Sequence, residues 1–192
     1  MTAQKTDNHN LRAKLELRRR VLDAFTLKAK APLSVLDCFS GEEVIWSTLR
    51  KEYSLQEYLA LDVKPKRGRL KMDSLRYLQN QSWRHDVIDL DAYGSPWAHF
   101  IEVCKRVAVL KTQFAVFLTV GNSIMKNQPA QGLAIAGITF PVPPGISGQL
   151  ADLVLMHCLA EPLRAGLQIQ QIIEAANPGG SARYLGMQIC GK

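Results

Sequence analysis

Residues 86–97 of this 192-residue chain read Asp86-Val87-Ile88-Asp89-Leu90-Asp91-Ala92-Tyr93-Gly94-Ser95-Pro96-Trp97. The first half is apolar and rich in β-branched residues, which predicts a buried central strand. Asp89 and Asp91 have the same parity, so both side chains should leave this strand on one side. Gly94 permits a tight turn, and Ser95 followed by Pro96 suits the start of a helix. Open α/β sheets bind ligands where their strands end, so this strand end is a candidate site.

Strands and helices alternate on both sides of this stretch, which predicts an α/β fold: a mostly parallel sheet with helices on both faces. The expected helices cover residues 10–30, 42–53, 74–80, 95–106, 149–159 and 167–176. The other expected strands cover residues 34–38, 57–62, 114–120 and 183–190, the last at an edge or antiparallel. Residues 122–148 are rich in Pro and Gly, which favours a long loop that closes over a substrate. We divide the chain into a basic arm and helix at 1–30 and an α/β domain at 31–192.

The eight residues Asp89-Leu90-Asp91-Ala92-Tyr93-Gly94-Ser95-Pro96 resemble the fourth motif of class I S-adenosylmethionine-dependent methyltransferases, which have a Rossmann-like fold. They are most similar to the Asp-Pro-(Tyr/Phe)-Gly-Ser-Pro version in the tRNA (guanine-N2) dimethyltransferase family. The chain departs from that family at Ala92, where the family has proline. The resemblance implies that Asp91 and the Ala92 carbonyl accept the N–H bonds of an amino substrate and that Tyr93 stacks on a flipped base. The alternative is an ordinary strand–turn–helix corner with acidic caps.

The resemblance extends over roughly residues 33–121 and implies a site for S-adenosyl-L-methionine. Acids end the successive strands at the places where the family binds the methionine part, the ribose and the adenine of this cofactor. The implied cofactor-binding residues are Asp37, Gly41, Asp62, Asp73, Ser74 and Asp89. The turn at Gly41 departs from the family, because it has one glycine where the family has two or three. Each strand-terminal acid could also be a simple helix or turn cap.

The net charge of +7 favours a polyanionic partner. Basic residues cluster in the first predicted helix and in the loop at 64–71, which favours contacts with nucleic-acid phosphates. We take RNA as the favoured nucleic acid. The candidate phosphate contacts are Arg18, Arg19, Arg20, Lys64, Lys66, Arg67 and Arg69. The alternative in both segments is a solvated face of charged side chains.

Composition argues against several other classes of protein. No apolar stretch is long enough and free enough of charge to predict a membrane span, and the polar N-terminus does not resemble a secretory signal. The four cysteines are widely spaced, so we expect neither a zinc site nor a disulfide framework. We therefore expect a cytoplasmic protein with reduced thiols and no bound metal.

The sequence thus predicts a methyltransferase that uses S-adenosyl-L-methionine and acts on an exocyclic amino group of a nucleic-acid base, with RNA favoured. Two alternatives stay open. One is a degenerate methyltransferase fold that binds nucleic acid without catalysis, which the single glycine and Ala92 favour. The other is a methyltransferase for a small molecule or a protein.

Overall fold

The computed structural model describes residues 10–29, 32–64, 70–80, 82–92, 94–110, 113–121, 134, 147–175 and 182–191. Several residues singled out from the sequence lie outside these ranges: Lys66, Arg67, Arg69, Tyr93 and nearly all of the 122–148 loop. No helix in the described ranges is long and apolar enough to cross a membrane. Within the same ranges, no group of three or more His, Cys, Asp or Glu side chains is arranged to hold a metal ion.

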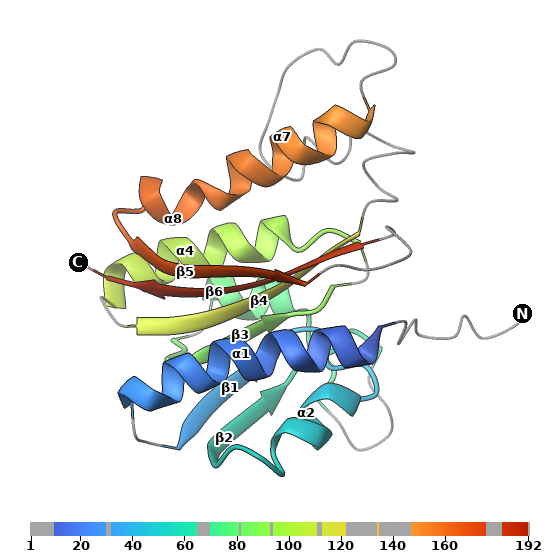
Figure 1. The fold of residues 1–192 in the computed structure, drawn as a ribbon, viewed down its shortest axis with the longest axis vertical. Helices are drawn as coiled ribbons and strands as arrows, with labels where there is room; N and C mark the ends of the chain where they lie inside the picture. The colour runs from blue at the N-terminus through green and yellow to red at the C-terminus, as the bar shows by residue number, and fades with distance from the viewer. Residues whose placement is uncertain are drawn as a thin grey trace, which may run out of the picture.

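A six-stranded sheet forms the centre of the molecule, with the strand order β2-β1-β3-β4-β6-β5 (Figure 1). The strands are β1 Leu33–Asp37, β2 Leu55–Ala60, β3 Val87–Leu90, β4 Gln113–Gly121, β5 Gln168–Ala175 and β6 Ala182–Cys190. Strands β2, β1, β3 and β4 are parallel to one another, whereas β6 is antiparallel to both β4 and β5. The chain leaves β1 for β2 on one side and then crosses to β3 on the other. Ligands of open α/β sheets bind at such a reversal of strand order.

Helices cover both faces of the sheet, which confirms the predicted α/β fold (Figure 1). The helices are α1 Leu11–Ala29, α2 Val44–Leu49, α3 Ser74–Asn80, α4 Trp97–Leu110, α7 Ser147–Leu159 and α8 Glu161–Arg164. Helices α1 and α2 share one apolar cluster with Val87 and Phe117, while α4 and α7 share the other with Ile88 and Leu118. Adjacent side chains of β3 and β4 therefore pack on opposite faces of the sheet, as the alternation of side chains along a strand requires.

The helix predicted at residues 167–176 is wrong, because this segment is strand β5. Its residues alternate between exposed and half-buried along the whole strand, and it pairs with β6 from Gln168 to Ala175. Isoleucines at 169, 172 and 173 suit a strand, and a partner strand satisfies the backbone groups that a helix would have satisfied internally. Strand β6 is antiparallel, as predicted, but it lies inside the sheet and not at its edge.

The turn after β3 packs closely against the end of β4. Gly94 has φ of 122°, which favours glycine, and its carbonyl accepts a hydrogen bond of 2.7 Å from the Gly121 N–H. A Cβ on Gly121 would lie 2.9 Å from that carbonyl oxygen. Ser95 does not make the predicted helix cap, because its hydroxyl has no partner among the described residues and α4 begins at Trp97.

Close packing of α1 on β6 gives the first testable prediction. A Cβ on Gly186 would lie 2.8 Å from Cγ2 of Val21 and 3.2 Å from the Phe117 ring. Gly186→Ala should therefore lower the free energy of unfolding by about 1–3 kcal/mol through overpacking. Val21→Ala removes the methyl groups that clash. The double variant should therefore lose less free energy of unfolding than the two single variants lose together. Urea unfolding of the four proteins measures this coupling, and strict additivity would contradict the packing described.

Candidate active site

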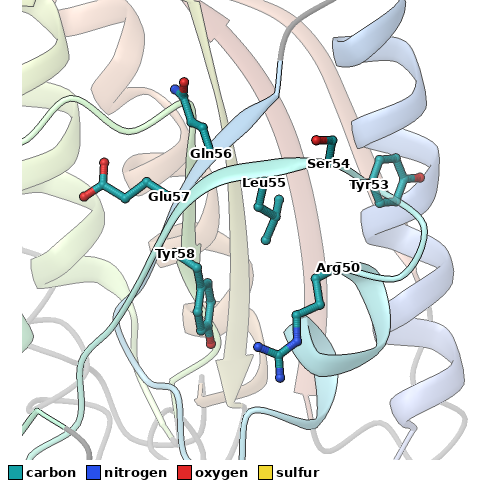
Figure 2. Close-up of a pocket in the computed structure, with 7 residues that line it drawn as sticks. All are labelled: Arg50, Tyr53, Ser54, Leu55, Gln56, Glu57 and Tyr58. Atoms are coloured by element: carbon teal, nitrogen blue, oxygen red, sulfur yellow. The ribbon is translucent and has the colours of Figure 1, made fainter.

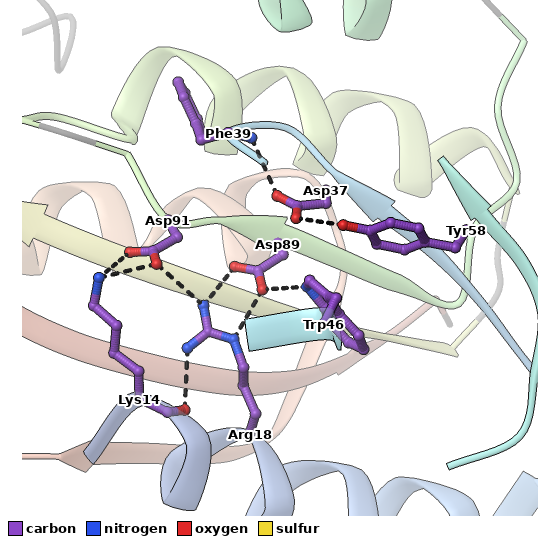
Figure 3. A network of polar contacts seen from close by, with 8 residues as sticks. All are labelled: Lys14, Arg18, Asp37, Phe39, Trp46, Tyr58, Asp89 and Asp91. Atoms are coloured by element: carbon purple, nitrogen blue, oxygen red, sulfur yellow. Dashed lines mark hydrogen bonds and ion pairs between the residues drawn. The ribbon is translucent and has the colours of Figure 1, made fainter. Parts of the chain in front are cut away.

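Three aspartates gather where β1 and β3 end, on the face of the sheet that α1 covers (Figure 3). Asp37 closes β1 and is the register partner of Asp89 in β3. Asp91 follows β3 directly and shares the parity of Asp89. Both carboxylates leave the strand on one side, as the sequence predicted, and that side faces α1. The acids predicted from separate strands therefore lie together at the reversal of strand order.

Arg18 of α1 forms a buried ion pair with Asp89. The guanidinium donates from Nε and Nη2 to the two carboxylate oxygens, at 2.8 and 2.6 Å. It also donates to the Lys14 carbonyl at 3.1 Å, and the Trp46 indole N–H donates to Asp89 at 2.7 Å. The side chains of Arg18 and Asp89 are 2% and 1% exposed. Burial alone would lower the pKa of Arg18, but the carboxylates of Asp89, Asp91 and Asp37 together outweigh it and the pKa is raised.

Lys14, one turn before Arg18, is paired with Asp91. Its ammonium lies 2.7 and 2.9 Å from the two carboxylate oxygens and 5.3 Å from the centre of the Tyr184 ring. The Arg18 Nη2 atom lies 4.0 Å from Oδ2 of the same carboxylate. Burial alone would raise the pKa of Asp91, but Arg18 and Lys14 outweigh it and the pKa is lowered. Asp91 is therefore an anion that a lysine of the same chain already neutralises.

Lys14 was not among the site residues predicted from the sequence, although a signal for it exists. Lys14 and Arg18 lie four residues apart and continue the buried stripe of Val21, Leu22 and Phe25 along α1. Basic residues at core positions of a helix are rarely buried unless they are paired. Their spacing with the apolar stripe could have indicated that they face buried acids.

Asp37 lies beside the Arg18–Asp89 and Lys14–Asp91 ion pairs and accepts hydrogen bonds from two other neighbours. The Tyr58 hydroxyl of β2 donates to one oxygen at 3.0 Å, and the Phe39 N–H donates to the other at 3.3 Å. Burial, and then the nearby Asp89 carboxylate, raise the pKa of Asp37 well above its usual range. Two cations thus face three carboxyl groups, and burial beside the Asp89 carboxylate favours the protonated form of Asp37.

The turn after β1 is tied to the acid that follows β2. Gly41 has φ of 47°, and its N–H donates to Asp62 at 3.0 Å. The Lys64 N–H donates to the other Asp62 oxygen at 2.7 Å, and Asp62 forms an isolated parallel bridge with Lys71. Asp62 therefore holds the glycine turn and the following loop together, at the strand end where the sequence places it.

The predicted adenine contacts lie at the start of α3. Asp73 caps this helix by accepting a hydrogen bond of 3.1 Å from the Arg76 N–H. The Ser74 hydroxyl and Nε2 of His99 share a hydrogen bond of 3.0 Å, and the ring of His99 lies 4.7 Å from that of Phe39. Because Phe39 belongs to the turn after β1, these side chains join the starts of α3 and α4 to the site.

The structure contradicts the prediction that Arg18 contacts nucleic-acid phosphates, because its guanidinium is buried on Asp89. Arg19 forms two hydrogen bonds of 2.7 Å with Glu52 on the surface. Four of the seven candidate phosphate contacts lie in the described residues. Of these four, Arg20 and Lys64 are exposed, as a phosphate contact requires.

A separate pocket of 430 Å³ lies along β2 and the end of α2 (Figure 2). Its lining residues are Arg50, Tyr53, Ser54, Leu55, Gln56, Glu57 and Tyr58. None of them is a site residue predicted from the sequence. Tyr58 alone connects this pocket to the acidic site, through its hydrogen bond to Asp37.

The buried pair of Arg18 and Asp89 predicts a large difference between two neighbouring arginines. Arg18→Met should lower the free energy of unfolding by about 3–5 kcal/mol, because it leaves Asp89 buried without a cation. Arg19→Met removes an exposed pair with Glu52 that solvent screens, so it should change the free energy of unfolding far less than Arg18→Met does. Urea unfolding of both variants tests this contrast. Equal losses would mean that the Arg18 pair is not the stronger constraint on α1.

Burial of His99 predicts a dependence of stability on pH. Burial lowers its pKa from 6.5 to about 4, so between these values the unfolded chain binds a proton that the folded chain does not. Stability should therefore fall as the pH drops from 6.5 toward 4, with a contribution of at most about 1.4 kcal/mol per pH unit. His99→Gln should remove this contribution in thermal unfolding, while curves above pH 7 serve as the control. An unchanged slope in the variant would refute the assignment.

Comparison with known proteins shows the fold of the chain. No protein-family model and no curated protein sequence matches it. Trm1 from Pyrococcus horikoshii, solved in complex with S-adenosyl-L-methionine, matches 100% of this chain with a TM-score of 0.65 and 13% identity. This chain spans 59% of the length of that protein. The plantazolicin methyltransferase BamL, solved with SAH, matches 94% of this chain and 85% of its own, with a TM-score of 0.59 and 11% identity.

Magnesium protoporphyrin IX methyltransferase (ChlM) from Synechocystis PCC 6803, solved with bound SAH, is also similar. It matches 100% of this chain and 89% of its own, with a TM-score of 0.55 and 9% identity. Identities this low show the fold alone, so the resemblance to the tRNA dimethyltransferase family is not confirmed. The chain therefore has the Rossmann-like fold of solved methyltransferases.

Proposed function

We propose that this protein is an S-adenosylmethionine-dependent methyltransferase that modifies an exocyclic amino group of a nucleic-acid base, with RNA favoured. One observation carries the proposal: Asp89 and Asp91 end β3 beside Asp37 of β1, at the reversal of strand order. Carboxylates at this point of an open α/β sheet are well placed to bind a ligand. The methyltransferase folds of the solved proteins agree with this chemistry.

The site contains polar groups that fit the proposed cofactor. Among the described residues, Nδ1 of His99 and the Ser95 hydroxyl are buried without a hydrogen-bond partner. They lie four residues apart around the start of α4, and His99 contacts Phe39 and Ser74. An aromatic base with hydrogen-bonding edges would satisfy both groups. Asp62 accepts one N–H at each oxygen and keeps a further lone pair on each for ribose hydroxyls.

The residues that would hold this cofactor are Asp62 at the ribose and Asp73, Ser74 and His99 at the adenine. S-adenosyl-L-methionine supplies an electrophilic methyl group when bound. Asp37 ends β1 and Gly41 lies in the turn that follows, so both would border the methionine part. Asp89, which the sequence also assigned to the cofactor, is buried with both oxygens already bonded to Arg18 and Trp46, so its side chain is not available for that contact. The electrostatic fit is favourable, because the cofactor carries a positive sulfonium and the turn bears acids where a phosphate ligand would be repelled.

Asp91 and the carbonyl of Ala92 would orient the substrate. An exocyclic amino nitrogen delocalises its lone pair into the base, and two acceptors on its N–H groups would turn that lone pair toward the methyl group. Positioning of this kind can supply much of a rate enhancement. The Ala92 N–H donates to the Leu90 carbonyl at 2.8 Å. This bond, which proline cannot make, restrains the backbone at the position where the resembling family has proline.

Exposed cations support a nucleic-acid substrate. Arg12 and Arg20 of α1 and Lys64 and Lys71 beyond β2 are exposed, and the chain has a net charge of +7. Cations on the elements that flank the acidic site would contact phosphates while a base enters it. Binding should consequently weaken with added salt.

A second candidate function is nucleic-acid binding without catalysis. The specific observation in its favour is that the Lys14 ammonium already holds both oxygens of Asp91. If that pair never opens, the substrate has no access to the carboxylate. The two functions differ in one measurable property, which is methyl transfer.

Methyl transfer from tritiated S-adenosylmethionine to tRNA, DNA and small-molecule pools tests the proposal. Asp91→Ala should abolish transfer and Asp91→Asn should retain part of it, because asparagine keeps one acceptor oxygen. Both variants should still bind cofactor in calorimetry, whereas Asp62→Ala should weaken that binding by about 1–3 kcal/mol. Asp152→Ala, which removes an exposed partner of Arg183, is the control and should behave as the unmodified protein.

Two results would overturn the proposal. A fully active Asp91→Ala protein would make the corner after β3 a structural turn. No cofactor binding by the unmodified protein at millimolar concentration would favour the non-catalytic function. Thermal unfolding of each variant shows whether a loss of activity reflects a loss of folding.

A further inference from the structure

Two basic residues of α1 occupy the site, and they are held to different degrees. Arg18 makes two hydrogen bonds to Asp89 in a nearly inaccessible setting and contacts the Phe117 ring at 5.1 Å. The Lys14 and Asp91 side chains are 9% and 15% exposed, so this pair borders solvent. A lysine ammonium is a point charge on a flexible stem, whereas the arginine fork matches a carboxylate in shape. The Lys14 pair is therefore the easier of the two to open.

Lys14 occupies the position that an amino substrate needs. Its ammonium donates to both oxygens of Asp91, and the Arg18 Nη2 atom lies 4.0 Å from Oδ2. A carboxylate has about four lone-pair directions, and the ammonium takes one on each oxygen while the Arg18 guanidinium places a second positive charge beside them. An incoming amino group would meet a cation in place of a free acceptor.

The first turn of α1 has little stability of its own. It contains no acidic residue, and Arg12 and Lys14 both lie near the helix N-terminus, where positive charge is unfavourable. Asn10, which precedes the helix, has φ of 67°, and its carbonyl accepts the Lys14 N–H at 3.1 Å. The pair with Asp91 therefore helps to hold this turn in place.

We propose that residues 11–14 form a displaceable cover over the site, in which Lys14 occupies Asp91 until an amino substrate replaces it. Arg18 is the fixed anchor about which this turn opens. When the turn opens, the substrate amino group replaces Lys14 at the Asp91 carboxylate. This replacement rests on the proposed methyltransferase function, whereas the opening of the turn does not.

Hydrogen exchange of the free protein tests the opening itself. The amides of Leu15 to Arg18 bond to the carbonyls of residues 11–14, so they report on this turn. Asp91→Asn weakens the hold on Lys14 and should speed their exchange about tenfold, with little change at Leu22 to Phe25. Glu52→Gln, which loosens the exposed Arg19 pair, is the control and should leave both groups of amides unchanged. Uniform acceleration along α1, or none, would overturn the proposal.

Kinetics with the methyl-accepting substrate test the competition. Lys14→Met should lower KM for that substrate about threefold to tenfold with kcat little changed, because the competent state no longer requires opening. Lys14→Arg should raise KM, because its fork holds Asp91 more firmly, and it preserves the charge if Lys14→Met does not fold. A fall in kcat in both variants at unchanged KM would overturn the proposal and make Lys14 part of the catalytic machinery.

The two experiments separate failure of this inference from failure of the proposed function. Faster exchange confined to residues 15–18 without any methyl transfer would support the cover and refute the methyltransferase activity. Methyl transfer with uniform exchange along α1 and unchanged KM in both Lys14 variants would support the activity and refute the cover.

Discussion

The buried ion pair between Arg18 and Asp89 is the constraint on which the rest of this structure depends. Removing two charges from water costs several kcal/mol for each ion, and only well-made hydrogen bonds can offset that cost. The pair meets this condition through both guanidinium bonds, the Trp46 indole and the Lys14 carbonyl. Since these groups come from α1, α2 and β3, the pair sets how both helices lie on the sheet.

The same pair sets the charge balance of the candidate site. Arg18 pairs with both oxygens of the buried Asp89 carboxylate, and Asp89 in turn helps to raise the pKa of the neighbouring Asp37. With Lys14 on Asp91, two cations balance two anions, and Asp37 is the carboxyl group left to respond to a further positive charge. A cationic cofactor would favour the ionised form of Asp37. The site is therefore suited to cations, and the two that it now holds, Arg18 and Lys14, belong to the chain itself.

Much of the site could be predicted from the sequence, because strand ends are local features. The shared side of Asp89 and Asp91, and the acids at the end of β1 and after β2, followed from short patterns. The structure places Asp37 beside Asp89 and Asp91, and it bonds Asp62 to the turn after β1. The helix predicted at 167–176 was wrong for the opposite reason. Its state depends on pairing with β6, and no local pattern reports a partner strand. Arg18 was misassigned to the surface because its charge, considered alone, favours solvent.

The sequence by itself determined the alternation of strands and helices and the acids that end the parallel strands. Each follows from the spacing of apolar residues and from turn chemistry over a few positions. Only the tertiary structure decided that Lys14 and Arg18 fill the site. Their partners Asp91 and Asp89 lie 77 and 71 residues away along the chain. A contact over that distance exists only once the sheet has brought β3 beneath α1, and its stability comes from burial that no single segment has.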